Sequence, residues 1–272
     1  MIDIPGRGRS ASVVGVDLAW GRRAPSGLCA VAPDGTVVAS ATLVTDDQIV
    51  GWIGEHAPGP AVVGFDAPLA VTNPSGRRRC EELVSRAFRA QGAGAYPSNR
   101  SMPAFVDGGR AAALARRLGL VLDPGDAERS RRGLAVEVYP HSALVALFGL
   151  PTRLTYKAGR GRGVELRRAE MARLVGLIEA LAGRDPGLGA GAGPRWQLLR
   201  TAVTGAARHV DLERVEDELD AHVCAYVARS LAADRRDGGG RVRVLGDWAS
   251  GAIVTPVDER QAALLDPASP AG

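Results

Sequence analysis

Short apolar runs and longer stretches with helical spacing alternate along this chain, which is the pattern of an α/β protein. The first run, 12–20, is apolar on both sides, as expected for a strand in a sheet that is covered on both faces. The Asp34-Gly35 pair separates the next two runs and predicts a hairpin. The predicted strands are 12–20, 27–33, 36–44, 61–66 and 134–140, and a closing hairpin is predicted over 241–256.

Apolar residues at spacings of three and four predict helices between and after these strands. Thr45 or Asp46 is expected to cap the first helix, which would place Ile49, Trp52 and Ile53 on one buried face. The predicted helices are a short one ending at His56 and others at about 77–91, 109–119, 141–150, 164–182, 195–207 and 212–234.

Three polar or glycine-rich segments are predicted to lack regular structure. Segment 123–132 reads as a polar loop, 152–163 is basic and rich in glycine, and 185–194 reads as a flexible break of low complexity. No internal repeat is visible at the periods typical of solenoids. The expected organisation is a single domain over 10–256, with helical and loop insertions near 70–132 and 152–207, and a tail over 257–272.

The composition is that of an ordinary globular protein with an unusual choice of basic residues. Hydrophobic residues make up 46% and charged residues 24% of the 272 residues, and the net charge is +4. Lys157 is the single lysine among 34 basic residues. Arginine suits phosphate recognition, although a coding bias toward Arg and Ala produces the same usage. A mild basic excess therefore permits a nucleic-acid partner without establishing one.

The cysteines and the N-terminus bear on the compartment. Cys29, Cys80 and Cys224 are scattered and form no paired spacing, which argues against a disulfide framework or a structural zinc site. The segment 1–10 has no apolar core of a signal peptide, and no apolar run reaches the length of a membrane span. We therefore expect a cytoplasmic protein that is not bound to a membrane.

Acidic residues stand near the C-terminal ends of three predicted strands. The two segments that contain Asp17 and Asp66 both read Val-Val-Gly-apolar-Asp, and Glu137 occupies a similar place in the fifth strand. Open α/β sheets place their sites at this end of the strands. Because Gly15 and Gly64 lack side chains, they would let a helix approach the sheet closely.

The last long helix adds two more acids on its apolar side. At 100° per residue, Asp217 and Asp220 share a face with apolar residues such as Cys224 and Val227, one helical turn apart. Solvated acids are expected on the other face. That opposite, polar face is expected to carry Arg214, Glu218, His222 and Arg229.

A cluster of buried acids repels itself unless a cation is present, and Mg²⁺ or Mn²⁺ prefers such oxygen ligands. Two such ions can activate water and stabilise the leaving oxygen in phosphodiester cleavage. Taken singly, Asp17 and Asp66 can each cap a turn, and Glu137 can pair with an arginine. Asp217 can interact with a helix dipole. The joint pattern favours a metal site.

The chain resembles the domain-of-unknown-function 429 family, whose members are described as predicted nucleases of the ribonuclease H-like, RuvC-type fold. The resemblance extends over nearly the whole chain and depends on the order of several short motifs. These are VVGVDLAWG (13–21), VVGFDAPLA (62–70), Arg79-Cys80, AYPSNR (95–100), VEVYPHSAL (136–144), YKAGRGRGVELRR (156–168), DELDAHVCAYVA (217–228) and GDWASGAIVTP (246–256).

The resemblance implies a fold and a set of ligands. The fold would be an α/β ribonuclease H-like mixed β-sheet, an antiparallel meander followed by parallel strands, covered by helices. It implies that Asp17 bridges two Mg²⁺ or Mn²⁺ ions, that Asp66 is a second ligand, and that Asp220 is the helix ligand with Asp217 assisting. Glu137 matches a glutamate of the family, and we include it among the catalytic candidates. Asp66 is shorter than the glutamate often found there, which would draw its metal nearer the sheet.

Basic and aromatic residues near these acids are candidates for substrate contacts. Arginine clusters with flexible glycines can clamp a phosphate backbone, although a solvated loop has the same composition. Tyr96, Tyr139 and Tyr156 can stack on bases or pack internally, and His141 can act as an acid or base or simply pack. The predicted phosphate contacts are Lys157, Arg160, Arg162, Arg167, Arg168 and Arg100.

The leading expectation is a metal-dependent nuclease that hydrolyses phosphodiester bonds in nucleic acid. One alternative is a non-catalytic module that binds nucleic acid or protein and keeps the acids for a structural ion or for arginine pairs. Another is an actin-like phosphotransferase, which shares the strand meander but needs a second such domain. The type of nucleic acid is left open.

Overall fold

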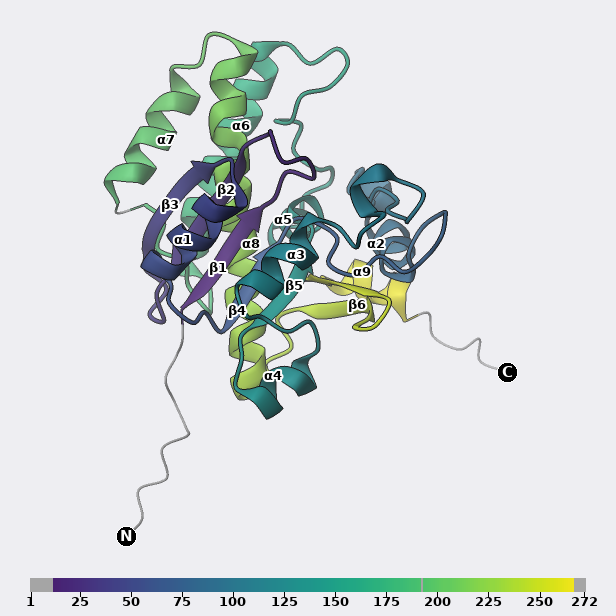
Figure 1. The fold of residues 1–272 in the computed structure, drawn as a ribbon. Coiled ribbons are helices and arrows are strands. Elements are labelled where there is room, and N and C mark those ends of the chain that lie inside the picture. Colours follow the sequence, from purple (N-terminus) through teal and green to yellow (C-terminus); the bar gives the residue numbers. More distant parts are fainter. Residues whose placement is uncertain (1–11, 192, 267–272) are drawn as a thin grey trace.

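Seven strands form one mixed sheet in the computed structural model, which describes residues 12–191 and 193–266 (Figure 1). In their spatial order the strands are β3 (Val37–Leu43), β2 (Ser26–Val31), β1 (Val13–Asp17), β4 (Val62–Phe65), β5 (Leu134–Val138), β7 (Gly251–Thr255) and β6 (Arg243–Asp247).

The directions of the strands match the expected arrangement. β1, β2 and β3 form an antiparallel meander, β4, β5 and β7 continue from β1 in parallel, and β6 returns antiparallel to β7. The predicted α/β class, with a meander that precedes parallel strands, is therefore confirmed, and the sheet is consistent with a ribonuclease H-like arrangement. β1 and β4 pair so that Gly15 lies opposite Gly64.

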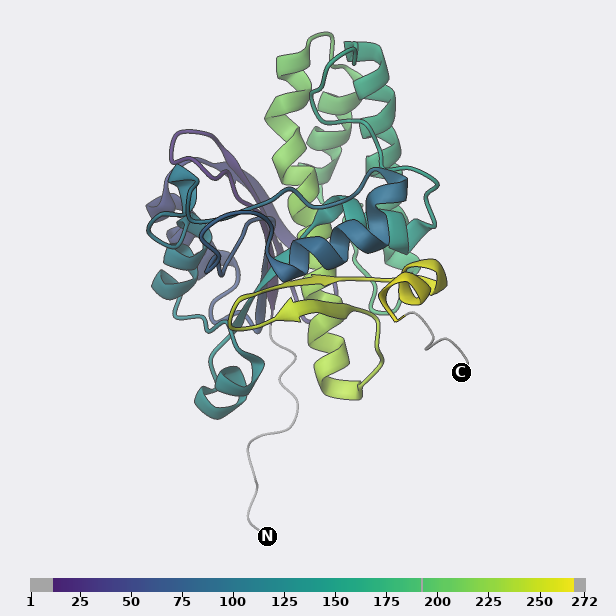
Figure 2. The same cartoon turned by 90° about the vertical axis from the view of Figure 1, so that its right-hand side faces the viewer.

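Helices cover both faces of the sheet. α1 and α3 pack on one face, while α8 crosses the other face together with α2, α5 and α6. Figure 2 shows the first half of α8 beside α6 and α7, and α2 against the β6–β7 hairpin. The helices are α1 (Asp46–His56), α2 (Arg79–Phe88), α3 (Arg110–Arg117), α4 (Pro124–Ser130), α5 (Pro140–Phe148), α6 (Val164–Ala180), α7 (Pro194–Thr204), α8 (His209–Asp237) and α9 (Glu259–Leu265), with 3₁₀ turns at Arg89–Gln91, Pro103–Phe105 and Leu181–Gly183.

Glycines allow α8 to lie directly on the sheet. A Cβ atom at Gly15 would stand 2.0 Å from the carbonyl oxygen of Ala221, and one at Gly27 would stand 1.9 Å from that of Asp217. At Gly64 the corresponding distance, to the carbonyl oxygen of Cys224, is 2.8 Å. These atoms belong to the backbone of α8 and cannot turn aside. The close approach expected from the glycines is confirmed.

Two short helices were not predicted. α4 lies in the segment expected to be a polar loop; Asp123 caps it by accepting hydrogen bonds from the backbone of Gly125 and Asp126. α9 lies in the segment expected to be a tail, where Asp258 and Gln261 form a capping box and the helix packs on α2. Each has seven residues, which is too short to show a clear apolar period.

Residues 185–191 contain no helix or strand, as predicted, but they are anchored to the rest of the fold. The backbone N–H of Gly189 donates to the carbonyl of Gly35 at 2.8 Å, and Leu188 is fully buried. Composition does not predict this anchoring, because the hydrogen-bond partner lies in the distant turn that precedes β3. Three parts of the chain lie outside the described residues: the N-terminal segment 1–11, Ala192, and the end of the predicted tail, 267–272.

The face of α8 that was expected to be polar is also largely buried. Glu218 and His222 are fully enclosed, because β3 and α7 cover this side of α8. Ser40 of β3 contacts Glu218, and Trp196 of α7 packs against His222. Arg195 of α7 and Ser40 of β3 both donate to the carboxylate of Glu218. Placing these two residues on a solvated face was wrong. Within the described residues, no helix is long and apolar enough to cross a membrane.

Substitution Gly15→Ala should lower the free energy of unfolding by about 3 kcal/mol, since the new methyl group overlaps the backbone of α8. Gly54→Ala is the matched control: Gly54 lies in α1 with open space around it, so this change should raise stability by roughly 0.5–1 kcal/mol. Chemical denaturation measures both. Equal effects of the two substitutions would contradict the close contact.

Candidate metal centre

Three carboxylates meet at one end of the sheet. Asp17 ends β1, Asp66 follows β4, and Asp220 projects from α8. Each of them offers an oxygen atom within 4.8 Å of the oxygens of the other two. Asp17 and Asp220 are buried, with Asp220 fully enclosed, and Asp66 is half-buried.

Strand pairing and helix contact bring these residues together. β1 and β4 run parallel with Val16 opposite Phe65, so the residues that follow them emerge at the same edge. The backbone N–H of Asp66 donates to the carbonyl of Val16 at 2.8 Å and continues the ladder by one step. α8 then lies on Gly15 and Gly64, which places Asp220 above the strand ends.

Lys157 and Tyr156 reach the carboxylates from the loop between α5 and α6. Nζ of Lys157 is 2.6 Å from Oδ2 of Asp220 and 3.5 Å from Oδ2 of Asp17. The hydroxyl of Tyr156 donates to Oδ1 of Asp220 at 2.6 Å. The compact ammonium of the chain's single lysine thus faces two of the three carboxylates at once.

The cluster has more negative charge than its protein partners neutralise. Oδ2 of Asp17 and Oδ2 of Asp220 are buried, and their cationic neighbour among the described residues is the single ammonium of Lys157. One ammonium group faces three carboxylates, and unpaired carboxylates are costly to bury. Oxygen-only ligands are those that Mg²⁺ and Mn²⁺ prefer. The residues therefore fit a divalent cation.

The pKa values reflect this crowding. Burial raises the pKa of Asp17 well above its ordinary value, although Lys157 acts in the opposite direction. Burial likewise raises the pKa of Asp66 to about 7, and Asp220 and Glu137 add to the shift. A bound cation would reverse these shifts, because it favours the charged form of each carboxylate.

Asp217 lies beside this centre. It is outside the group of three that can share one ion, and it is half-buried one helical turn before Asp220. Burial, partly offset by Lys157, raises its pKa to about 6. Its field also raises the pKa values of Asp17 and Asp66. Its expected role as an assisting ligand stays a prediction.

Glu137 is held by an arginine that sequence analysis did not connect with it. Nη2 and Nη1 of Arg78 donate to its two carboxylate oxygens at 2.7 and 2.8 Å, and the N–H of Leu69 donates at 3.3 Å. Arg78 also pairs with Glu81 at 2.8 Å, and all three charged groups are buried. Glu137 is therefore paired with an arginine, as one of the alternatives drawn from the sequence expected. The expected catalytic role of Glu137 stays a prediction.

The predicted phosphate contacts fall into two groups. Arg167 is 1% exposed and its guanidinium faces Glu216, Glu213 and the carbonyl of Tyr156, so a phosphate chain cannot reach it. Arg168 is half-buried and occupied by Glu165 and the carbonyl of Ala206. The remaining predicted contacts are the exposed Arg100 and Arg160, the half-buried Arg162, whose guanidinium holds the carbonyl of Lys157, and Lys157 itself, which faces the acids.

The candidate aromatic residues and His141 differ in how far they are exposed. Tyr156 is fully buried and cannot stack on a base, whereas Tyr96 is 65% exposed. Tyr139 is half-buried and donates to the carbonyl of Gly94. His141 is buried between Tyr139 and Tyr156, and burial lowers its pKa to about 3, so its imidazole is neutral at physiological pH.

Sequence reasoning missed the acid contacts of Lys157 and the Arg78–Glu137 pair. The choice of lysine in a chain that otherwise uses arginine was the available signal for the first. No signal marked Arg78, because it is one of three consecutive arginines at 77–79 whose directions depend on the start of α2.

Fold and site together define an α/β protein with a mixed seven-stranded sheet and a buried carboxylate centre at the strand ends. The chain belongs to the family described as "Protein of unknown function (DUF429)", whose profile matches residues 15–243. No curated protein and no solved structure matches the chain. The family expected from the sequence is therefore confirmed.

Without metal, the free energy of unfolding should fall as the pH rises from about 4 to about 7. The folded pKa of Asp66 is about 7 against an ordinary 3.8, so the folded state holds protons that the unfolded state has already released. Asp66→Asn should make this slope shallower by at most about 1.4 kcal/mol per pH unit. Denaturation in EDTA across this range measures the slope. The exposed Asp126→Asn is the control and should leave the slope unchanged. The same unchanged slope in Asp66→Asn would contradict the raised pKa of Asp66.

Glu137→Gln should destabilise the fold by about 2 kcal/mol, because the buried Arg78 loses a charged partner while keeping Glu81. It should leave the thermal shift produced by Mn²⁺ unchanged, whereas Asp17→Asn should abolish that shift. Thermal unfolding with and without Mn²⁺ separates the two effects. Loss of the Mn²⁺ shift in Glu137→Gln would instead make Glu137 a ligand.

Proposed function

We propose that this protein is a metal-dependent nuclease that hydrolyses phosphodiester bonds. The observation that supports this most directly is the group formed by Asp17, Asp66 and Asp220, whose oxygens lie within 4.8 Å of one another at the strand ends. A structural carboxylate would be paired throughout, as Glu137 is with Arg78. Here a single ammonium, that of Lys157, faces the buried Oδ2 atoms of both Asp17 and Asp220, at 3.5 and 2.6 Å, so three carboxylates share one cationic group.

Asp17, Asp66 and Asp220 would hold Mg²⁺ or Mn²⁺, and Asp217 stands close enough to affect a second ion. Bound there, such ions supply a water activated for attack and stabilise the charge on the leaving oxygen. Tyr156 fixes the orientation of Asp220 through its hydroxyl. Its own position is fixed because Arg167 donates to its carbonyl oxygen from within the core.

Lys157 supplies a permanent positive charge beside the acids. Its neighbours Asp220 and Asp17 raise its pKa well above the ordinary value despite the opposing effect of burial. Its side chain is 32% exposed, so the ammonium can turn toward a phosphate when a cation takes its place among the carboxylates. His141 stays neutral and contributes packing against Tyr156.

A small cleft lies beside Asp66. Its lining includes Asp66, Trp20, Tyr96 and Tyr139, and its volume is about 60 Å³. Trp20 and Tyr96 are exposed at 40% and 65%, so aromatic surface flanks the entrance. Nucleic-acid enzymes use such surface to stack bases while the backbone reaches the reactive centre. This arrangement supports nucleic acid as the substrate.

The ion pair between Lys157 and Asp220 favours a second candidate, a binding module whose carboxylates are neutralised by its own lysine. In that case the cluster needs no metal. The actin-like alternative has less support, because the described residues contain one sheet and the phosphotransferase requires two such domains. A thermal shift with ATP would be expected for that alternative alone.

Purified protein should cleave at least one of single-stranded, duplex, hybrid or branched substrates when Mg²⁺ or Mn²⁺ is added. Asp17→Asn should reduce the rate by at least about 100-fold, because it removes a charged ligand from the centre of the cluster. Asp126→Asn, an exposed aspartate on α4 paired with Arg129, is the matched control and should retain full activity.

The alternative functions predict other results. A Mn²⁺ thermal shift without cleavage of any substrate would favour a structural ion, and no Mn²⁺ shift at all would favour the module neutralised by Lys157. Cleavage that persists in Asp17→Asn would assign the activity to a contaminant and refute the proposal.

A further inference from the structure

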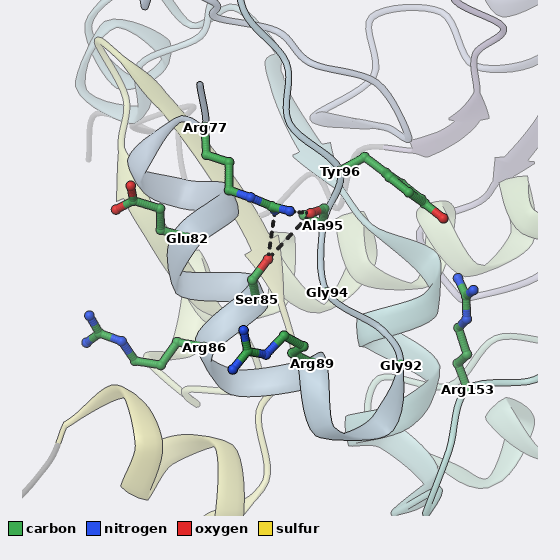
Figure 3. A pocket seen from close by; sticks show the side chains of 10 residues that line it. All are labelled: Arg77, Glu82, Ser85, Arg86, Arg89, Gly92, Gly94, Ala95, Tyr96 and Arg153. Atoms are coloured by element: carbon green, nitrogen blue, oxygen red, sulfur yellow. Dashed lines mark hydrogen bonds between the residues drawn. The ribbon is translucent and has the colours of Figure 1, made fainter. Parts of the chain in front are cut away.

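An open pocket lies between α2 and the loop that follows it (Figure 3). Its volume is about 550 Å³. Arg86 and Arg89 stand at the end of α2, and Arg153 approaches from the chain across the loop. We call it the arginine pocket; the residues used below are Arg77, Glu82, Arg86, Arg89, Tyr96 and Arg153.

The charge of this pocket is unbalanced. Four arginines line it against one acid, Glu82, which is itself 3.2 Å from Arg79. Among the described residues, the guanidinium groups of Arg86, Arg89 and Arg153 form no hydrogen bond or ion pair. By comparison, the exposed Arg208 pairs with Asp211 at 2.8 Å. The unbalanced cluster therefore indicates an anionic ligand.

The wall of the pocket is held in place by hydrogen bonds and by buried side chains. Nη1 of Arg77 donates to Oγ of Ser85 at 3.1 Å and to the carbonyl of Ala95, which ties the loop to α2 (Figure 3). Ala87 and Phe88 are fully buried in the core and fix the turn that carries Arg86 and Arg89. The guanidinium groups thus extend from a rigid surface, as phosphate recognition requires.

The arginine pocket adjoins the cleft that contains Asp66. Ala95 and Tyr96 line both, and the cleft also contains Asp66. Tyr96, 65% exposed, therefore stands between a candidate reactive centre and a set of unpaired arginines. Its ring has room to stack on a base whose neighbouring phosphates lie on either side.

We infer that the arginine pocket binds the phosphate backbone of a single-stranded nucleic acid whose scissile phosphate lies at the carboxylates, with a base stacked on Tyr96. The inference deepens the proposed nuclease function and rests on it for the position of the scissile bond. An unpaired strand is required, because bases within a duplex are stacked on one another and cannot stack on a side chain. An acidic peptide would bind the arginines without using Tyr96.

Binding of a fluorescent single-stranded oligonucleotide of mixed sequence in EDTA tests the inference without any cleavage. Arg86→Gln combined with Arg89→Gln should weaken binding roughly tenfold and reduce the slope of log K against log salt by about 1.4, the value for two lost phosphate contacts on a single strand. Arg173→Gln combined with Arg200→Gln is the control of equal charge, on exposed positions of α6 and α7, and should bind like the parent protein.

Tyr96 distinguishes nucleic acid from other anions. Tyr96→Ala should weaken binding of the oligonucleotide about tenfold, and Tyr96→Phe should restore it because the ring is kept. A duplex of the same sequence should bind more weakly than the single strand. Equal affinity for the duplex, an unchanged Tyr96→Ala variant, or equal losses in the two double arginine variants would each overturn the inference.

The outcomes separate this inference from the nuclease proposal. If the pocket variants lose binding while no metal supports cleavage, the nuclease proposal fails together with the position of the scissile phosphate, and the binding of a single strand by the arginine pocket stands. If the pocket variants bind normally while Asp17→Asn abolishes cleavage, the nuclease proposal stands and the substrate binds along a surface other than the arginine pocket.

Discussion

The direct contact between α8 and the strands β1 and β4 is the constraint on which the rest of the structure depends. It requires glycine at positions 15 and 64, since any side chain there would enter the backbone of the helix. The same contact determines which residues meet. With α8 lying this close, Asp220 reaches the ends of β1 and β4, where Asp17 and Asp66 emerge. A helix held farther from the sheet would leave these acids too far apart to share an ion.

Bringing the acids together has an electrostatic cost, and the surrounding residues limit it. Burial raises the pKa values of Asp17 and Asp66, while Lys157 lowers them. Tyr156 donates to one oxygen of Asp220, and the ammonium of Lys157 faces the other at 2.6 Å. This balance explains why the centre suits metal chemistry: it folds around its own lysine and retains more negative charge than that lysine removes.

Arginine has two roles in this protein, and only tertiary structure separates them. Arg78 and Arg167 are buried, and their forks each meet two glutamates, so they organise the core around the site. Arg86, Arg89 and Arg153 line an open pocket and have no acidic partner among the described residues. In sequence the two groups look alike, since both lie in arginine-rich stretches without a distinguishing period.

The sequence alone determined the succession of strands along the chain and the acids that stand at the strand ends, and the order of its motifs indicated the family, whose resemblance implied the meander before the parallel strands. These features are local, because strand patterns, the Asp34-Gly35 turn and motif order need no knowledge of distant contacts. Tertiary structure decided the partners: Arg78 for Glu137, Lys157 for Asp220, and the burial of Glu218 and of Arg167. Such pairs join positions far apart along the chain, so only the packing of helices on the sheet can bring them into contact.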